Sequence, residues 1–406
     1  MFTIVKYDLF TFVNLQMNMD YSRLYLDFQD YKNTAFSGRY LELETLQDSI
    51  LKLPKEFQIK QIGESVNQQP IYCVYWGNGN KKVLAWSQMH GNETTTTKAL
   101  FDFVNFLDIQ KEGDFVKQLS ATSQMALIFV LNPDGAKAYT RLNANQIDLN
   151  RDAFEVTQPE MKALQQVYRE FKPNLCLNLH GQRSIFSAGM QKNPAIVSFL
   201  SPSVNMTRSV TSTRITSMQL IVEMSSMLKS FIPNQVGRYD DAYNENCIGD
   251  HFQGLETPTI LFEAGHYPGD YNREETRKLM FLAFVKLFES MLQNSYETIP
   301  HKTYFEIPKN QKLYYDCILR NVIIAGTSYD FAIQYEEALE QNRVAFIPKL
   351  VQIDNLSNVF GHREEHLAEE IVSINEVKVL QKPNINSVIE GLRTKNKTFS
   401  LKILKN

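Results

Sequence analysis

Short, nearly continuous apolar runs alternate with segments of helical periodicity between residues 57 and 293. Apolar runs without polar interruption are typical of strands that are buried on both faces of a sheet. Apolar residues spaced three and four apart indicate helices that cover such a sheet. The predicted strands are 57–63, 71–76, 82–88, 125–131, 174–179 and 259–262, and the predicted helices are 41–53, 93–110, 159–171 and 273–293. This alternation predicts an α/β fold of three layers, with a mixed, mostly parallel sheet flanked by helices.

The pattern changes after Ile299-Pro300, where short β-like runs replace the alternation. The sequence predicts β-structure at 304–307, 314–325, 344–353, 376–380 and 399–403, and a short acidic helix at 364–370. We therefore expect three parts. These are an N-terminal extension with the first elements (1–70), a main α/β domain (71–299) and a small β-rich C-terminal domain (300–406).

Composition narrows the class of protein. Among 406 residues, 43% are hydrophobic and 21% are charged, which excludes disordered and fibrous classes. The net charge of −3 and the absence of a basic stripe give no reason to expect nucleic acid as a partner. The four cysteines have no CxxC spacing, so they predict no thiolate metal site and fit a reducing compartment.

We expect neither a secretion signal nor membrane attachment. Asp8 and Asn14 interrupt the apolar N-terminus, and no apolar run reaches the length of a membrane span. These features predict a cytoplasmic protein, and the sequence leaves its oligomeric state open.

Several predicted strands end in residues that can bind a metal ion or transfer a proton. His90 and Glu93 follow the strand at 82–88, His180 follows the strand at 174–179, and Glu263 follows the strand at 259–262. Ligand crevices in open α/β sheets form at the carboxyl ends of the strands. Zn²⁺ accepts both imidazole nitrogen and carboxylate oxygen. The sequence therefore indicates a candidate metal-binding site at this edge of the sheet.

Six short motifs occur in a fixed order along this region. They are His90-Gly-Asn-Glu93, Asn132-Pro-Asp-Gly135, Arg141, Asp148-Leu-Asn-Arg151, Leu179-His-Gly181 and Phe262-Glu-Ala-Gly265. In order and approximate spacing, the set resembles the zinc carboxypeptidase family typified by carboxypeptidase A. The resemblance covers residues 83–292. It implies a metallocarboxypeptidase with one Zn²⁺ per chain, acting on a peptide or amide that has a free carboxylate.

The resemblance assigns the metal ligands and the proton-transfer group. His90, Glu93 and His180 would hold the zinc and leave one position open for water. Glu263 would be the general base that takes a proton from that water and passes it to the leaving amine. Asp148 would orient a zinc-bound imidazole.

The resemblance also assigns substrate contacts. Arg141 would stabilise the developing oxyanion, and Asn150 with Arg151 would bind the terminal carboxylate of the substrate. The mobile phenol of the family corresponds to Tyr243 or Tyr239, with a slight preference for Tyr243 as the catalytic one and Tyr239 as a substrate contact.

Some positions depart from the family pattern or stay open. The family has an arginine just before the glutamate of the first motif, where this chain has Asn92. Ile248 would favour an apolar terminal side chain in the specificity pocket, whereas Asp250 would favour a basic one. His266 matches no ligand position but follows Glu263 closely enough to line the rim of the pocket.

Two rival functions fit the same residues. One is a zinc amidase or deacylase on the same scaffold, similar to aspartoacylase or to enzymes that trim cell-wall peptides. The other is a peptide-binding protein that has lost turnover. The Asn132-Pro-Asp-Gly135 turn followed by Arg141 favours the carboxypeptidase, and no proposed ligand, base or carboxylate-binding residue is missing.

Overall fold

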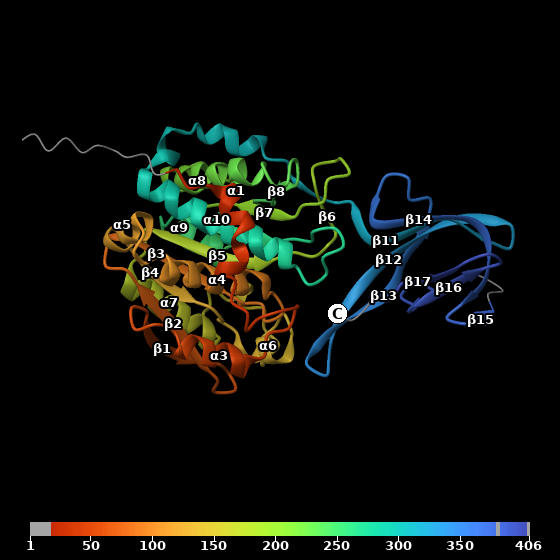
Figure 1. Ribbon diagram of the computed structural model, residues 1–406, viewed down its shortest axis with the longest axis horizontal. Coiled ribbons are helices and arrows are strands. Elements are labelled where there is room, and N and C mark those ends of the chain that lie inside the picture. The colour runs from red at the N-terminus through yellow and green to blue at the C-terminus, as the bar shows by residue number, and fades with distance from the viewer. Residues whose placement is uncertain (1–17, 379–381, 404–406) are drawn as a thin grey trace, which may run out of the picture.

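A mixed sheet of eight strands forms the centre of the larger part of the protein (Figure 1). The computed structural model describes residues 18–378 and 382–403. The strand order is β1-β2-β4-β3-β5-β9-β7-β8, and β3, β4, β5 and β9 run parallel to one another. The strands are β1 (Gln58–Glu64), β2 (Pro70–Trp76), β3 (Lys81–Ser87), β4 (Ser123–Ile128), β5 (Leu175–Gly181), β7 (Val197–Leu200), β8 (Val236–Arg238) and β9 (Thr259–Ala264).

Helices cover both faces of this first sheet. The helices are α1 (Tyr21–Leu26), α2 (Phe28–Tyr31), α3 (Leu43–Leu51), α4 (Thr95–Ile109), α5 (Asp114–Thr122), α6 (Pro133–Ala138), α7 (Pro159–Phe171), α8 (Ser212–Leu228), α9 (Ile248–Gly254) and α10 (Glu274–Gln293). Short 3₁₀ helices are η1 (Leu149–Arg151), η2 (Ser295–Thr298) and η3 (His301–Glu306).

The central strand β3 shows why the sheet needs cover on both sides. Successive side chains of a strand point to opposite faces. Val83 and Ala85 belong to the apolar core that includes α4, α8 and α10, whereas Leu84 and Trp86 belong to the core that includes α7 and α9. All four side chains are fully buried. The apolar run therefore occupies the middle layer, and its polar continuation emerges at the sheet edge.

A second sheet follows in the C-terminal part of the chain (Figure 1). Its main path is β13-β12-β11-β14-β16-β17, with β15 paired to β14, and a separate two-stranded ladder joins β10 to β6. The strands are β6 (Phe186–Ala188), β10 (Asn310–Lys312), β11 (Tyr314–Ile324), β12 (Thr327–Glu340), β13 (Arg343–Asp354), β14 (Phe360–Ile374), β15 (Val377–Lys378), β16 (Gly391–Thr394) and β17 (Thr398–Ser400). A core of its own, with Leu319, Phe331 and Leu350, stabilises this sheet.

The predicted fold class is confirmed: a mixed sheet is flanked by helices and followed by a β-rich C-terminal region. Two local predictions are wrong. Residues 304–307 are not a strand, because η3 covers most of them and buries Tyr304 in the first core. Residues 364–370 are not a helix but part of β14, which pairs in parallel with β11. Glu364 and Glu365 are half-buried in this strand, and the Glu364 carboxylate accepts from the buried Arg320 side chain at 3.1 Å.

The predicted division into three domains stays a prediction, and the second sheet begins at Tyr314. The expectation of no secretion signal concerns residues 1–17, which lie outside the described residues, as does part of the run 376–380. Within residues 18–378 and 382–403, no helix has both the length and the apolar character needed to cross a bilayer.

Candidate metal centre and active-site cleft

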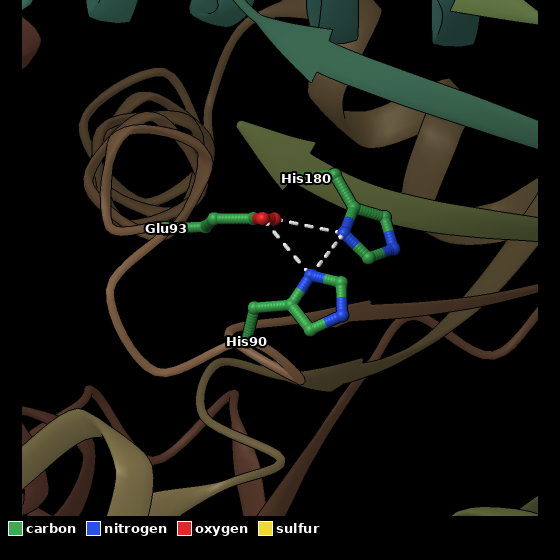
Figure 2. Close-up of side chains that lie close together, drawn as sticks. All are labelled: His90, Glu93 and His180. Atoms are coloured by element: carbon green, nitrogen blue, oxygen red, sulfur yellow. Dashed lines mark hydrogen bonds and ion pairs between the residues drawn. The ribbon is translucent and has the colours of Figure 1, made fainter. Parts of the chain in front are cut away.

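Three side chains converge at the carboxyl edge of the first sheet (Figure 2). The loop after β3 carries His90 and Glu93, and β5, which pairs with β3 in parallel, ends with His180 and Gly181. The Nδ1 atoms of the two histidines lie 3.1 Å apart. The Glu93 carboxylate lies 2.9 Å from His90 Nδ1 and 2.8 Å from His180 Nδ1. The three ligand atoms thus face one small space.

The donor set and its surroundings fit a zinc ion. One donor atom from each of the three residues lies within 4.8 Å of the other two. Both imidazoles are buried, at 2% exposure. Two imidazole nitrogens and one carboxylate are ligands that Zn²⁺ takes in hydrolytic sites, where a fourth position stays open. The predicted ligand set is therefore brought together as the sequence motifs required.

Asp148 connects the triad to Arg141. Its carboxylate lies 3.0 Å from His90 Nε2 and accepts from Arg141 at 3.0 and 3.1 Å. Burial alone would raise the pKa of Asp148, but the contacts with His90 and Arg141 outweigh it and lower that pKa. A carboxylate on Nε2 leaves Nδ1 of His90 free to face the metal site. Arg141 also reaches Glu93 Oε1 at 3.4 Å, and its side chain is 46% exposed.

Glu263 stands beside the triad on the neighbouring strand. In the parallel pair of β5 and β9, Glu263 is opposite His180. The residue is 8% exposed, and among the described residues its Oε2 atom has no hydrogen-bond partner. Burial and then the nearby charge of Glu93 raise the pKa of Glu263 well above its ordinary value. A buried carboxylate oxygen without a protein partner is available to exchange a proton with a bound molecule.

The two predicted carboxylate-binding residues are neighbours in η1. Asn150 Oδ1 accepts the backbone N–H of Ile248 at 3.0 Å, so the Asn150 amide NH₂ remains the free end of the side chain. The Arg151 guanidinium is held by the Asn150 carbonyl at 2.6 Å and by the Cys247 sulfur at 3.1 Å. Both residues line the cleft that contains the metal triad.

Of the two candidate tyrosines, the cleft contains one. Tyr239 lines the same cleft as Glu263, packs its ring 5.3 Å from that of Phe186, and has a pKa raised by burial and then by Glu263. Tyr243 is not among the described residues that line this cleft, and the charges acting on it are those of Glu245 and Asp250. The structure therefore brings Tyr239 to the site and does not bring Tyr243.

Ile248 and Asp250 were the two residues that the resemblance assigned to a specificity pocket, and their side chains point in different directions. Ile248 is fully buried and packs with Trp86 and Phe252 in the apolar core, away from the cleft. Asp250 lines the cleft, but its two oxygens accept the backbone N–H groups of Ser203 and Asn244, each at 2.9 Å. Burial raises the pKa of Asp250 to about 6.

Two apolar side chains near these residues in the cleft lining come from adjacent strands. Leu200 and Leu261 are cross-strand neighbours on β7 and β9, each is 9% exposed, and both line the cleft. A Cβ atom added at Gly249 would lie 3.1 Å from Pro202, so a side chain there would narrow the space.

The cleft has a volume of about 900 Å³ and includes residues that the sequence did not single out. His266 lines it, as expected, and so do Arg39, Arg273 and part of the second sheet. Arg273 begins the predicted helix 273–293 and is the N-cap residue of α10, but nothing in the local sequence marks Arg39 or the strands of the second sheet as neighbours of the metal triad.

Comparisons with known proteins indicate a family. Residues 43–219 match the family model described as zinc carboxypeptidase. Carboxypeptidase SOL1 of Arabidopsis thaliana is 25% identical over 155 residues, which cover 34% of this chain and 32% of that protein. The match thus spans about a third of the length of the curated relative.

Solved structures share the fold. A metallo-carboxypeptidase from Burkholderia cenocepacia superposes with a TM-score of 0.50 at 16% identity, over 62% of this chain and 67% of that one. Thrombin activatable fibrinolysis inhibitor superposes with a TM-score of 0.50 at 13% identity, over 65% and 77% of the two chains. The resemblance to the zinc carboxypeptidases is confirmed, and the structural likeness supports the fold alone.

Proposed function

We propose that this chain, whose residues 43–219 match the zinc carboxypeptidase family model, is a zinc-dependent metallocarboxypeptidase. It would hydrolyse the last peptide bond of a peptide with a free carboxylate. One observation carries the proposal: the ligand atoms of His90, Glu93 and His180 face one space, and the buried Glu263 carboxylate has an unpartnered oxygen on the adjacent strand.

The metal centre would be held by His90 Nδ1, His180 Nδ1 and the Glu93 carboxylate. A Zn²⁺ ion bound there supplies Lewis acidity, which polarises the scissile carbonyl and lowers the pKa of a water molecule to about 7. Asp148 holds the His90 ring through Nε2 and so keeps Nδ1 directed at the ion.

Proton transfer is the role of Glu263. Its free Oε2 accepts a proton from the attacking water and then donates it to the leaving amine nitrogen. Arg141, anchored by Asp148, presents its guanidinium to the oxygen on which negative charge develops. Tyr239 lines the cleft beside Glu263 and, as a phenol, can donate a hydrogen bond to the substrate.

Two sets of residues in the cleft would select the substrate, one for its terminal carboxylate and one for its terminal side chain. Arg151 and the free amide of Asn150 would bind the terminal carboxylate, since two donors on one carboxylate fix its position as well as its charge. Leu200 and Leu261 present apolar surface to the cleft and so favour an apolar terminal side chain. Asp250 is held in place by two backbone N–H groups.

The test is turnover by zinc-loaded protein on blocked dipeptides, acyl-amino acids and murein tripeptides. We expect cleavage of blocked dipeptides that end in an apolar residue. Glu263→Gln should lower kcat by at least about a hundredfold, while the exposed carboxylate change Glu170→Gln on α7 serves as the control.

Each rival has its own outcome in the same test. Preferred cleavage of acyl-amino acids or murein tripeptides would replace the proposal by the amidase function. Stoichiometric zinc with no cleavage in any arm would replace it by the peptide-binding function.

A further inference from the structure

Two strands of the second sheet form part of the wall of the cleft. We call β12 and β13 (residues 327–354) the hairpin. Tyr335 and Glu336 of β12, and Phe346 and Lys349 of β13, line the same cleft as the metal triad and Glu263. In Figure 1 the turn that joins these strands extends back from the second sheet toward the side of α6. The cleft is therefore shared between the two sheets.

Polar contacts hold the hairpin against the loops that carry the site. Glu337 accepts from the Arg39 guanidinium at 3.0 Å and from the Tyr139 hydroxyl. Gln334 Nε2 donates to Ser184 Oγ at 2.7 Å, a few residues after His180. Arg39 is only 8% exposed, so this attachment is largely shielded from water. The wall is fixed before any substrate binds, which reduces the entropy lost on binding.

Aromatic packing joins the wall to the loop after β9. The ring of Tyr271 lies edge-on to Tyr335 at 5.3 Å and to Phe346 at 5.2 Å. All three residues line the cleft, and Tyr335 and Phe346 are only partly buried. Partly exposed aromatic rings in a preformed cleft are favourable contact surfaces for a peptide.

The hairpin and the carboxylate-binding residues are held by different contacts. The described side-chain contacts of residues 334–337 and 346–351 with the first part of the chain reach Arg39, Tyr139, Ser184 and Tyr271. None of those described contacts reaches residues 149–151 or 247–250, which surround Asn150 and Arg151. The hairpin is therefore a part of the cleft wall that is held independently of Asn150 and Arg151.

We propose that the hairpin is a binding site for the substrate residues that precede the scissile bond. Its ligand is an extended peptide of at least four residues, with an apolar side chain packed against Phe346 and Tyr335. Chain length is then a determinant of specificity, because a blocked dipeptide bound at Arg151 leaves this wall without a partner. This inference rests on the proposed carboxypeptidase function.

The experiment compares kcat/KM for a blocked dipeptide and for a hexapeptide that share the same two C-terminal residues. The hexapeptide carries leucines at the positions before the scissile bond. Wild type should favour the hexapeptide, and Phe346→Ala should lower the hexapeptide-to-dipeptide ratio about tenfold, mainly through KM. Ile347→Ala is the matched control, since the next residue of a strand faces the opposite way and Ile347 does not line this cleft.

Tyr335→Ala provides a second variant, because Tyr335 lines the cleft, packs beside Tyr271 and pairs with Pro348, on the same face of the hairpin as Phe346. A hexapeptide-to-dipeptide ratio that stays at the wild-type value in both Phe346→Ala and Tyr335→Ala overturns the inference while the carboxypeptidase function stands. Absence of cleavage of both peptides by wild type would instead reject the proposed function.

Discussion

Removal of the Glu337 carboxylate is the most direct test of how the two sheets are held together. Glu337 accepts from Arg39 and Tyr139, which are 8% and 7% exposed, and its own side chain is 26% exposed. In Glu337→Ala the buried guanidinium of Arg39 loses its ion pair and the buried Tyr139 hydroxyl loses its acceptor.

The size of the effect follows from these exposures. Breaking a buried ion pair by removing one partner costs about 3–5 kcal/mol, and partial access of water to Glu337 places this change near the lower limit. Burial and then the charge of Arg39 lower the pKa of the buried Arg273 to about 10. Burial opposes the charge of Arg39 as well, but Glu337 outweighs it and raises the pKa of Arg39. We therefore expect Glu337→Ala to reduce the free energy of unfolding by about 3 kcal/mol.

Urea denaturation followed by fluorescence measures this free energy from the midpoint and slope of the transition. The adjacent Glu336→Ala is the matched control. Glu336 is 63% exposed and lies 3.6 Å from Lys349, and such surface pairs contribute at most about 1 kcal/mol. Equal, small losses in Glu337→Ala and Glu336→Ala would refute the view that Glu337 anchors the hairpin.

Three further predictions follow from the site and from the contact between the sheets. Asp148→Asn should weaken zinc binding about 10–100-fold in a competition titration with a chromophoric chelator, because the group that orients His90 loses its charge; unchanged affinity would contradict the role of Asp148. Leu261→Asp should raise kcat/KM for peptides ending in Arg or Lys relative to Leu by at least about tenfold, and an unaltered preference would show that Leu261 does not contact the terminal side chain. Burial lowers the pKa of His362 from 6.5 to about 4, so the unfolded chain takes up a proton first and stability should fall as the pH drops from 6.5 toward 4. His362→Gln keeps a donor for the Ser184 carbonyl, which lies 2.7 Å from His362 Nε2, and should flatten this dependence in urea titrations at several pH values; an unchanged slope would assign the dependence to other groups.

The main sheet could be predicted because its strands carry strong local signals. The apolar runs at 82–88 and 174–179 correspond to β3 and β5, and the polar residues that follow each run mark the edge where the site lies. Burial on both faces and the carboxyl-edge rule indicated the edge of the sheet at which His90 and His180 lie. Their assignment as metal ligands with Glu93 came from the resemblance to the zinc carboxypeptidases, whose short motifs can be recognised without knowledge of long-range contacts.

The second sheet was harder to predict because its strands are only half-buried. The acidic run 364–370 was predicted as a helix but lies within β14. Leu367 and Ile371 are buried in the core of the second sheet, whereas Glu370 is exposed and Glu369 is half-buried. β12 was not predicted at all, and its polar residues pair with partners that are distant in the sequence, as Glu337 does with Arg39. Such pairings depend on tertiary packing that a single sequence does not display.

The contact between Arg39 and Glu337 has a consequence for how the protein matures on the ribosome. Domains generally fold as units, N-terminal first, while synthesis continues. The eight strands of the first sheet end with β9 at Ala264, so the metal ligands and Glu263 are all translated well before β12 and β13. The zinc ligands of a nascent chain can thus come together before the hairpin has been synthesised. The part of the cleft wall that we propose to bind longer peptides is added by the last quarter of the polypeptide.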